Sequence, residues 1–217
     1  MRYYPRNGFT IYELLFVVVI VAVVASMTIF RPIHDDIDEA SKKISLYLKY
    51  TRYLALHDNQ YHRYFEENDT IWYKGRWTFK IQHCKKSIGG YYFVVYKDSD
   101  HEGYIDKVET ALDPLNNKYL YSNSDCVAIV DESPYVLLTK KYGVKKIVAN
   151  KHCKPYSSST VSMAMSFDEY GYAHNRLSAK PNEPNKYMLK APCVLTIYDN
   201  KENNATITIS DETGAIW

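Results

Sequence analysis

The sequence predicts an α+β fold in which a long N-terminal helix, apolar in its first half and amphipathic in its second, packs on an antiparallel β-sheet domain. Three observations predict this class. Residues 9–30 are mostly apolar, residues 33–55 repeat apolar side chains at helical spacing, and short strand-like stretches follow from residue 71 onward. The predicted organisation is a leader at 1–8, an apolar helix at 9–30, its amphipathic continuation at 31–58 and a β-rich domain at 59–217.

The apolar segment 9–30 is long enough to cross a bilayer core of about 30 Å. Arg2 and Arg6 precede it, so the rest of the chain is expected outside the cytoplasm. Glu13 lies inside the segment, where a carboxylate costs roughly 2.5–3.5 kcal/mol unless it is paired. Two alternatives are a secretory signal cut near Ala25, which Glu13 disfavours, and a signal anchor without an assembly role.

Residues after Pro32 continue in a helical period. One face of this segment is apolar, and the opposite face carries Asp, Glu and Lys side chains up to Lys43. This pattern is typical of an amphipathic helix that lies against a domain. The expected core face consists of Ile33, Ile37, Ala40, Ile44, Leu48, Thr51 and Ala55.

The remaining sequence reads as short strands, several of which alternate apolar and polar residues as half-buried antiparallel strands do. The segment 200–204 between the last two has the composition of a hairpin loop. The predicted strands are 71–74, 77–82, 91–97, 126–130, 135–139, 145–149, 160–167, 193–199 and 205–210.

Four cysteines follow the apolar segment: Cys84, Cys126, Cys153 and Cys193. In an extracytoplasmic domain they are expected to form disulfides, with three connectivities open. The alternative is a zinc site built from the pairs His83-Cys84 and His152-Cys153, which lack the usual C-x₂₋₄-C spacing. The expectation is therefore a disulfide-bonded domain without a metal.

No arrangement of residues predicts catalysis. The seven histidines are scattered and match no H-E-x-x-H, G-x-S-x-G or phosphate-loop pattern. Asp168 and Asp211 each precede a glycine by three residues, which suits a turn better than a pair of catalytic carboxylates. We expect no enzymatic activity and no cofactor.

A lysine-rich segment without carboxylates runs from residue 133 to 167. Lysines neutralise phosphates and aromatic rings stack on bases, so this is a candidate DNA-binding patch. The alternative is a solvated strand face with outward lysines. The segment carries Lys140, Lys141, Lys145, Lys146, Lys151 and Lys154, with Tyr135, Tyr142 and Tyr156 among them. Asn68 and Asn204 lie in Asn-x-Thr sequons and are candidate glycosylation sites.

The N-terminal residues from Gly8-Phe9 to Glu13, behind a basic leader and before the apolar run, resemble the class III signal of type IV pilins and pseudopilins. The resemblance implies cleavage between Gly8 and Phe9 by a prepilin peptidase and N-methylation of Phe9. It further implies pairing of Glu13 with the N-terminal amine of a neighbouring subunit. The implied location is the bacterial inner membrane, single-pass, with a periplasmic domain. The implied partners are other pilin or pseudopilin subunits, the peptidase, the inner-membrane assembly platform and lipid.

Three later segments, 46–55, 167–171 and 207–214, are similar to the GspH/FimT group of minor pseudopilins and minor pilins. This resemblance implies a structural subunit of a type II secretion pseudopilus, a type IV pilus or a competence filament. The alternative is a minor pilin that binds DNA during uptake through the lysine-rich segment. The arginine-rich tail of some DNA-binding relatives is not found in the last residues, which end in Gly214-Ala215-Ile216-Trp217.

Overall fold

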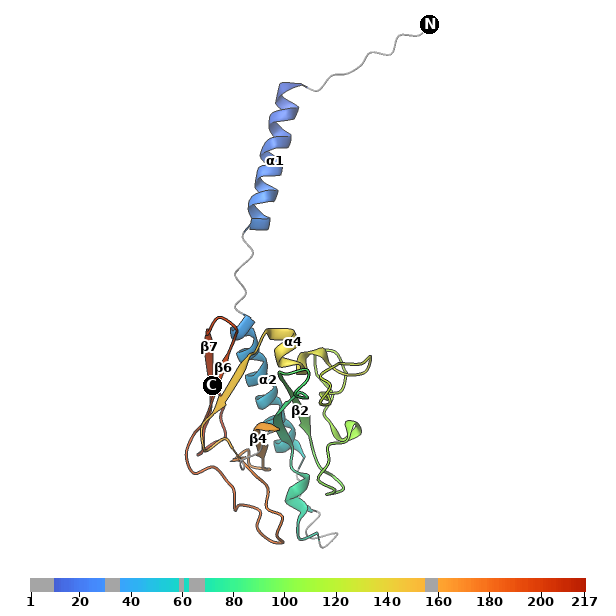
Figure 1. Ribbon diagram of the computed structural model, residues 1–217, viewed down its shortest axis with the longest axis vertical. Coiled ribbons are helices and arrows are strands. Elements are labelled where there is room, and N and C mark those ends of the chain that lie inside the picture. The colour runs from blue at the N-terminus through green and yellow to red at the C-terminus, as the bar shows by residue number, and fades with distance from the viewer. Residues whose placement is uncertain (1–9, 30–35, 59–60, 63–68, 155–159) are drawn as a thin grey trace. The chain divides into compact units, whose positions relative to one another are not determined.

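Helices come first in the described part of the chain, and strands follow from residue 78 onward. In the computed structural model the chain forms two compact units, Met1–Asp35 and Asp36–Trp217 (Figure 1). The residues that the structure describes are 10–29, 36–58, 61–62, 69–154 and 160–217, with side chains described in the first of these ranges up to residue 23.

The helix of the first unit, α1, spans Ile11–Ile29. Among the described residues, no helix combines the length and the apolar character needed to cross a membrane. The predicted membrane span at 9–30 and the predicted single-pass inner-membrane location are therefore corrected.

The second helix, α2, spans Asp36–His57 and belongs to the second unit. The predicted long helix over 9–58 is thus wrong, because α1 and α2 fall in different compact units and the buried face of α2 packs in the core of the second. Its buried face closely follows the expected one, except that Ile33 lies outside the described residues. The buried residues of α2 are Ile37, Ala40, Ile44, Tyr47, Leu48, Thr51 and Ala55.

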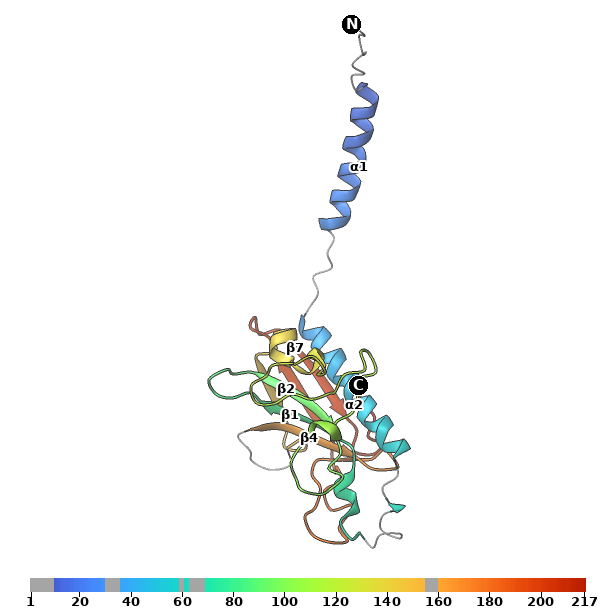
Figure 2. The same cartoon turned by 90° about the vertical axis from the view of Figure 1, so that its right-hand side faces the viewer.

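The strands form two antiparallel sheets, where a single sheet domain was predicted. One sheet has the order β2-β1-β4-β5 and the other the order β3-β6-β7. In Figures 1 and 2, α2 lies against both sheets, and a short helix, α4 (Leu138–Tyr142), lies near its N-terminal end. The strands are β1 Thr78–His83, β2 Tyr91–Tyr96, β3 Lys146–Ala149, β4 Val161–Phe167, β5 Ala173–His174, β6 Cys193–Tyr198 and β7 Asn204–Ile209.

The central strands β1 and β6 set the register of the two sheets. Phe79 of β1 is opposite Val95 of β2 on one side and Met165 of β4 on the other. Strand β6 pairs with β3 on one side and with β7 on the other. The Phe79 ring stacks on Phe93 at 5.0 Å between centroids, and Phe93 contacts Tyr47 of α2 at the same distance. Apolar side chains of helix and sheet therefore share one core.

Three predicted strands have another conformation. Residues 71–74 fall largely in a 3₁₀ turn, η1 (Trp72–Gly75), and residues 126–130 form no strand. Residues 135–139 lie in a second 3₁₀ turn, η3 (Pro134–Val136), and in α4. The Ser133 side chain accepts the N–H of Tyr135, and Pro134 is the first residue of η3, so local capping chemistry determines this stretch.

Two disulfides tie loops to the sheets. Cys84, which directly follows β1, is bonded to Cys126, and Cys153 is bonded to Cys193 at the start of β6. All four residues are buried. Within the described residues no cysteine is free, so the four sulfur atoms are engaged in covalent bonds and are not arranged as zinc ligands.

Candidate functional site

The first turn of α1 holds Glu13 in a reciprocal capping arrangement. The backbone N–H of Thr10 donates to Glu13 Oε2 at 2.8 Å, and the Thr10 hydroxyl donates to the same oxygen at 2.9 Å. The Glu13 N–H donates back to Thr10 Oγ1 at 3.4 Å. The hydrogen bonds from Thr10 lower the pKa of Glu13, so the carboxylate is charged at neutral pH. This is a capping box, in which an acidic group also interacts well with the helix dipole.

The described side chains that follow Glu13 are apolar and exposed on every side of α1. Leu14, Phe16 and Val18 expose 62%, 67% and 59% of their surface, and the others up to residue 23 are similar. Continuous apolar surface of this kind is unfavourable in water and indicates a surface that binds another apolar surface. Gly8 and Phe9, the predicted cleavage and methylation site, lie outside the described residues.

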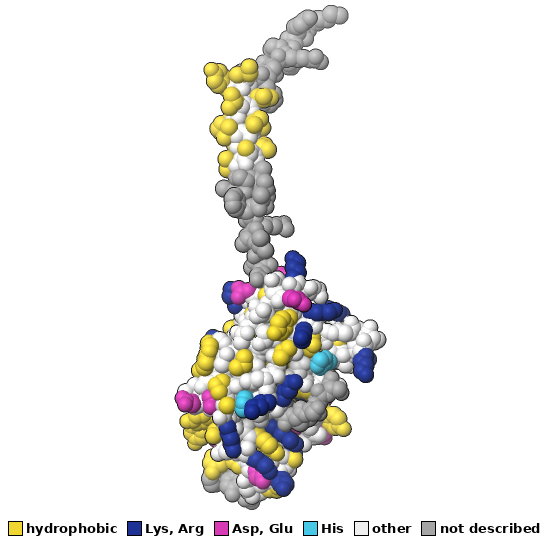
Figure 3. All heavy atoms as spheres, turned by 60° about the vertical axis from the view of Figure 1, so that its left-hand side comes forward, with side chains coloured by type: hydrophobic (Ala, Val, Ile, Leu, Met, Phe, Trp, Pro, Cys, Tyr) yellow, Lys and Arg dark blue, Asp and Glu magenta, His cyan; other side chains and the backbone are white. Residues whose placement is uncertain are grey.

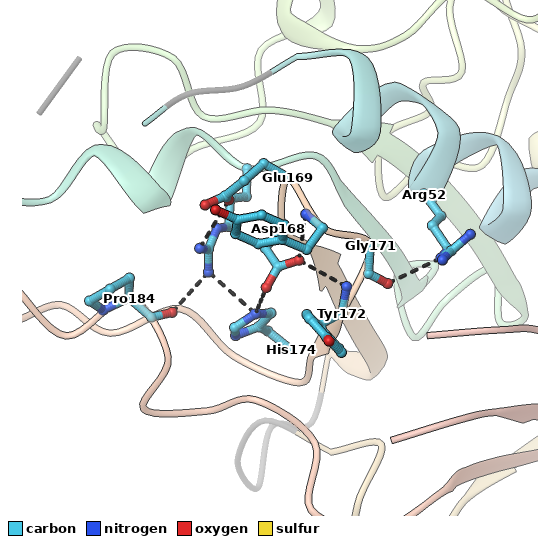
Figure 4. A network of polar contacts seen from close by, with 9 residues as sticks. Arg52, Asp168, Glu169, Gly171, Tyr172, His174 and Pro184 are labelled. Carbon is cyan, nitrogen blue, oxygen red and sulfur yellow. Dashed lines mark hydrogen bonds and ion pairs between the residues drawn. The ribbon is translucent and has the colours of Figure 1, made fainter. Parts of the chain in front are cut away.

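Three segments that were singled out in the sequence meet at Arg52 of α2. Arg52 Nε donates to the carbonyl of Gly171 at 3.1 Å, and its Nη2 donates to the carbonyl of Thr213 at 3.1 Å. Gly171 has φ of +84° and Gly214 has φ of +64°, a region that favours glycine. The helix, the β4–β5 turn and the C-terminal turn are therefore held together by one guanidinium, and the contact to Gly171 is visible in Figure 4.

The β4–β5 turn is organised by Asp168. Its Oδ1 accepts the backbone N–H groups of Tyr170 and Tyr172, at 3.0 and 2.8 Å, and its Oδ2 lies 3.0 Å from His174 Nε2 (Figure 4). Burial is the largest single effect and would raise the pKa of Asp168, but the contacts with His174, the Tyr172 N–H and the charge of Arg76 together lower it. The carboxylate accepts three hydrogen bonds, as a turn-forming aspartate does.

Arg76 and Glu169 extend this network. Arg76 Nη1 donates to the carbonyl of Pro184 at 2.8 Å, and Nη2 lies 3.4 Å from Glu169 Oε2. Burial lowers the pKa of His174, and the cationic Arg76 lowers it further. The imidazole is therefore neutral at pH 7, and its Nε2 lies 3.0 Å from Asp168 Oδ2 and 3.4 Å from Arg76 Nη1. A carboxylate beside a guanidinium partly compensates the cost of burying both.

A hollow of about 650 Å³ lies beside this network. His174 is fully buried and does not line it, and the hydrogen bonds of Asp168 are used within the protein. Asp168 and His174 are therefore engaged with each other and with the turn, and this arrangement braces the fold. The lining side chains include Tyr61, Trp72, Tyr170, Tyr172, Met188, Glu169, Asp211 and Glu212.

The candidate DNA-binding lysines are exposed, and they are spread from α4 through β3 to the turn that follows it. Lys140 and Lys141 lie in α4, Lys145 and Lys146 at the start of β3, and Lys151 and Lys154 in and after the turn that follows it. Figure 3 shows basic side chains on the visible face interspersed with uncharged and apolar ones.

The tyrosines proposed as stacking partners are mostly engaged in the fold. Tyr142 is buried, and Tyr135 has Lys43 over its ring at 4.7 Å and Lys141 at 5.8 Å. Tyr156 lies outside the described residues. The described part of the segment therefore resembles a solvated face more than a platform for bases.

One of the two candidate glycosylation sites lies at the end of a β-hairpin. Asn204 is exposed at the first position of β7, opposite Tyr198 of β6. Asn68 lies outside the described residues. The structure therefore leaves Asn204 accessible at the end of a hairpin.

One group of residues was missed by the sequence analysis. The loop that follows β2 brings carboxylates of Asp98, Asp100 and Glu109 together. Their spacing, with Gly103 between them, was a readable signal in the sequence. The partners of Asp168, namely His174 and Arg76, were also missed. Arg76 is about ninety residues away in the sequence, and no local pattern joins it to the turn.

Comparison of the chain with protein-family models, with curated proteins and with solved structures finds no match.

Proposed function

We propose that the chain is a structural subunit of a pilin-type filament, such as a type II secretion pseudopilus, a type IV pilus or a competence filament, and that it assembles through α1. The observation that carries the proposal is the combination of an apolar, exposed helix surface at residues 11–23 with one carboxylate, Glu13, in the first turn. Such a surface is stabilised when it packs against other apolar helices, and a charge placed in it needs a cation.

The arrangement around Glu13 suits an intermolecular ion pair. Both hydrogen bonds from Thr10 end on Oε2, so Oε1 is the acceptor that a cation of another subunit would take. Cleavage after Gly8 would supply such a cation as the α-amine of Phe9. An ion pair in an apolar helix bundle fixes the stagger between subunits, because any other register leaves a charge unpaired.

The contacts of Arg52 also support the proposal. They bring the segments 46–55, 167–171 and 207–214, for which the sequence predicts a relation to minor pilins and pseudopilins, to one place in the globular unit. The three segments contact one another, since Arg52 of α2 binds one carbonyl in each of the two turns. They can therefore be explained as one structural feature.

Two substitutions separate the charge of Glu13 from its capping role. Glu13→Gln keeps a side-chain acceptor for the Thr10 N–H, because glutamine also forms capping boxes, but it removes the charge. Thr10→Ala removes the side-chain cap at a cost of about 1 kcal/mol in helix stability and keeps the charge. We expect Glu13→Gln to reduce incorporation at least about tenfold, equivalent to about 1.4 kcal/mol, and Thr10→Ala to leave it near the wild-type level.

The measurement is the fraction of each variant recovered in filaments sheared from cells that produce the chain. In the same preparation, the N-terminal peptide should begin at an N-methylated Phe9. The opposite order, with Glu13→Gln assembling normally and Thr10→Ala defective, would show that Glu13 serves only the helix end. Recovery of a chain that still begins at Met1 would contradict the proposed processing.

A further inference from the structure

The segment from Asp98 to Glu109 has the residue spacing of a calcium loop. In a twelve-residue EF-hand loop, acidic or amide side chains occupy positions 1, 3 and 5, glycine occupies 6, a backbone carbonyl binds from 7, and glutamate occupies 12. This segment has an apolar residue at position 8, Ile105, which packs against the hydrophobic core. The matching positions are Asp98 at 1, Asp100 at 3, Glu102 at 5, Gly103 at 6, Tyr104 at 7, Asp106 at 9 and Glu109 at 12.

The fold brings the two ends of this loop together. Strand β2 leads into the loop, and the chain returns beside it, with Thr110 paired antiparallel to Tyr96. The N–H of Lys97 donates to the carbonyl of Glu109 at 3.2 Å, so the first and last acidic residues start from adjacent backbone. One side-chain oxygen from each of Asp98, Asp100 and Glu109 lies within 4.8 Å of the other two.

Backbone donors orient these carboxylates. The N–H of Gly103, which has φ of +81°, donates to Asp98 Oδ2 at 3.1 Å. The N–H of Glu102 donates to Asp100 Oδ1 at 3.0 Å, and the N–H of Ser99 donates to Glu109 Oε1 at 2.8 Å. The three carboxylates are therefore held toward one another by the loop itself.

Asp98 Oδ1 is a buried carboxylate oxygen that accepts no hydrogen bond from the described residues. This oxygen exposes less than 1 Å² and has no hydrogen-bond partner among the described residues. A buried carboxylate oxygen without a donor is costly and is uncommon unless it binds a cation, a proton or water.

Two lysines near the cluster are directed elsewhere, and His101 of the loop is a neighbour whose charge favours the ionised form of Asp98. Lys107, within the loop, is turned to Asp131 at 2.6 Å and Glu132 at 3.4 Å. Lys80 lines the same hollow as Asp98, but its ammonium lies over the Tyr96 ring.

We propose that the loop 98–109 is a calcium site, with the carboxylates of Asp98, Asp100 and Glu109 as its principal ligands. Hard oxygen ligands select Ca²⁺, Mg²⁺ or Mn²⁺ over softer metals. The twelve-residue spacing, with a carbonyl at position 7 and a glutamate at 12, suits the larger coordination number of Ca²⁺, whereas Mg²⁺ requires a near-ideal octahedron. Glu102 and Asp106 would complete the site in the same register.

The surroundings of the loop differ from those of an EF-hand and bear on its affinity. A strand precedes the loop and a 3₁₀ turn, η2 (Lys107–Glu109), ends it, where an EF-hand has two helices. Position 5 holds the longer Glu102, which is exposed. We therefore expect a dissociation constant of about 10⁻⁴ to 10⁻³ M, the weak end of the range for calcium loops.

The test is titration of the purified 217-residue chain with Ca²⁺, followed by calorimetry, and with Tb³⁺, followed by luminescence excited through tyrosine. Tyr104 occupies the seventh position and is the expected sensitiser. We expect one Ca²⁺ per chain, at least about tenfold weaker binding of Mg²⁺, and displacement of Tb³⁺ by Ca²⁺. Asp98→Asn and Glu109→Gln should each weaken Ca²⁺ binding at least about tenfold, because each removes a charged ligand.

Glu212→Gln is the matched control, since Glu212 is exposed and lies outside the loop, and it should bind as the wild type does. Circular dichroism without Ca²⁺ identifies any variant that has lost its fold, and Glu109→Gln remains informative if Asp98→Asn does not fold. The proposal is overturned if millimolar Ca²⁺ gives neither heat nor displacement of Tb³⁺. It is equally overturned if folded Asp98→Asn and Glu109→Gln variants bind as tightly as Glu212→Gln.

Discussion

Gly214 is the residue with the least space around it in the junction at Arg52. A Cβ atom built at this position would lie 2.0 Å from the Gly171 carbonyl oxygen, which itself accepts the hydrogen bond from Arg52. Relief would require the backbone of one turn to move, and that movement would break the contact with α2. The positive φ of Gly214 adds a second cost for any residue with a side chain.

Gly214→Ala should therefore destabilise the globular unit more than Gly143→Ala. Gly143, the C-cap of α4, has a similar φ of +67° but nothing within 4 Å of its virtual Cβ, so it reports the conformational cost alone. We expect about 1 kcal/mol for Gly143→Ala and about 1–3 kcal/mol more for Gly214→Ala. Urea unfolding of both variants measures the difference, and equal losses would contradict the close approach.

Glu13 has a role at the helix end that its sequence context predicts. The sequence places a carboxylate at the start of an apolar helix, which raises the question of its partner. The Thr-x-x-Glu spacing also encodes a capping box, and the structure contains it. The carboxylate thus has a partner within its own helix, and a second partner from another subunit is a matter for the Glu13→Gln test.

At the scale of elements, α2 was the most accessible to prediction and the middle of the chain the least. The helical spacing of apolar residues in α2 predicts which face is buried, because the apolar face of a helix packs against the core whatever its partner elements are. Residues 126–130 have the composition of a strand, yet Val127, Ile129 and Val130 are exposed in the structure. Their turn is set by Glu132, which accepts the Ile129 N–H.

The two disulfides should contribute similar amounts to stability, because their sequence separations are 42 and 40 residues. For loops of this size the chain-entropy model gives about 4 kcal/mol each, and measured values are typically about 2–4 kcal/mol. We expect the double variants Cys84→Ser/Cys126→Ser and Cys153→Ser/Cys193→Ser each to lose about that amount in denaturant unfolding. A loss below about 1 kcal/mol in either variant would show that the bridge does not stabilise the protein mainly by lowering the entropy of the unfolded chain.

At the scale of the whole molecule, the two units differ in how their apolar side chains are placed: those of the second unit form a buried core, and the described ones of α1 are exposed. The hydrophobic core lies between Ile37 and Ile216, entirely within the second unit. The described side chains of α1 are exposed. Folding of the globular unit is therefore not expected to depend on α1, whereas self-association is.

A chain that begins at Asp36 should accordingly unfold with the same denaturant midpoint as the 217-residue chain. It should sediment as a monomer, while the longer chain associates through α1, because exposed apolar surface is removed from water on association. Sedimentation velocity and denaturant unfolding on the two chains provide the measurements. A lower midpoint for the shorter chain would show that residues before Asp36 contribute to the core.

The sequence by itself determined the α+β class, the buried face of α2 and most of the strands, since these follow from periodicities of side chains along the chain. It also contained the spacing of the loop 98–109. Only the tertiary structure decided that there are two sheets, that α2 belongs to the globular unit, and which cysteines pair. It alone brought Arg52 to Gly171 and Arg76 to Glu169. These are contacts between residues far apart in sequence, and their geometry depends on packing that no local pattern encodes.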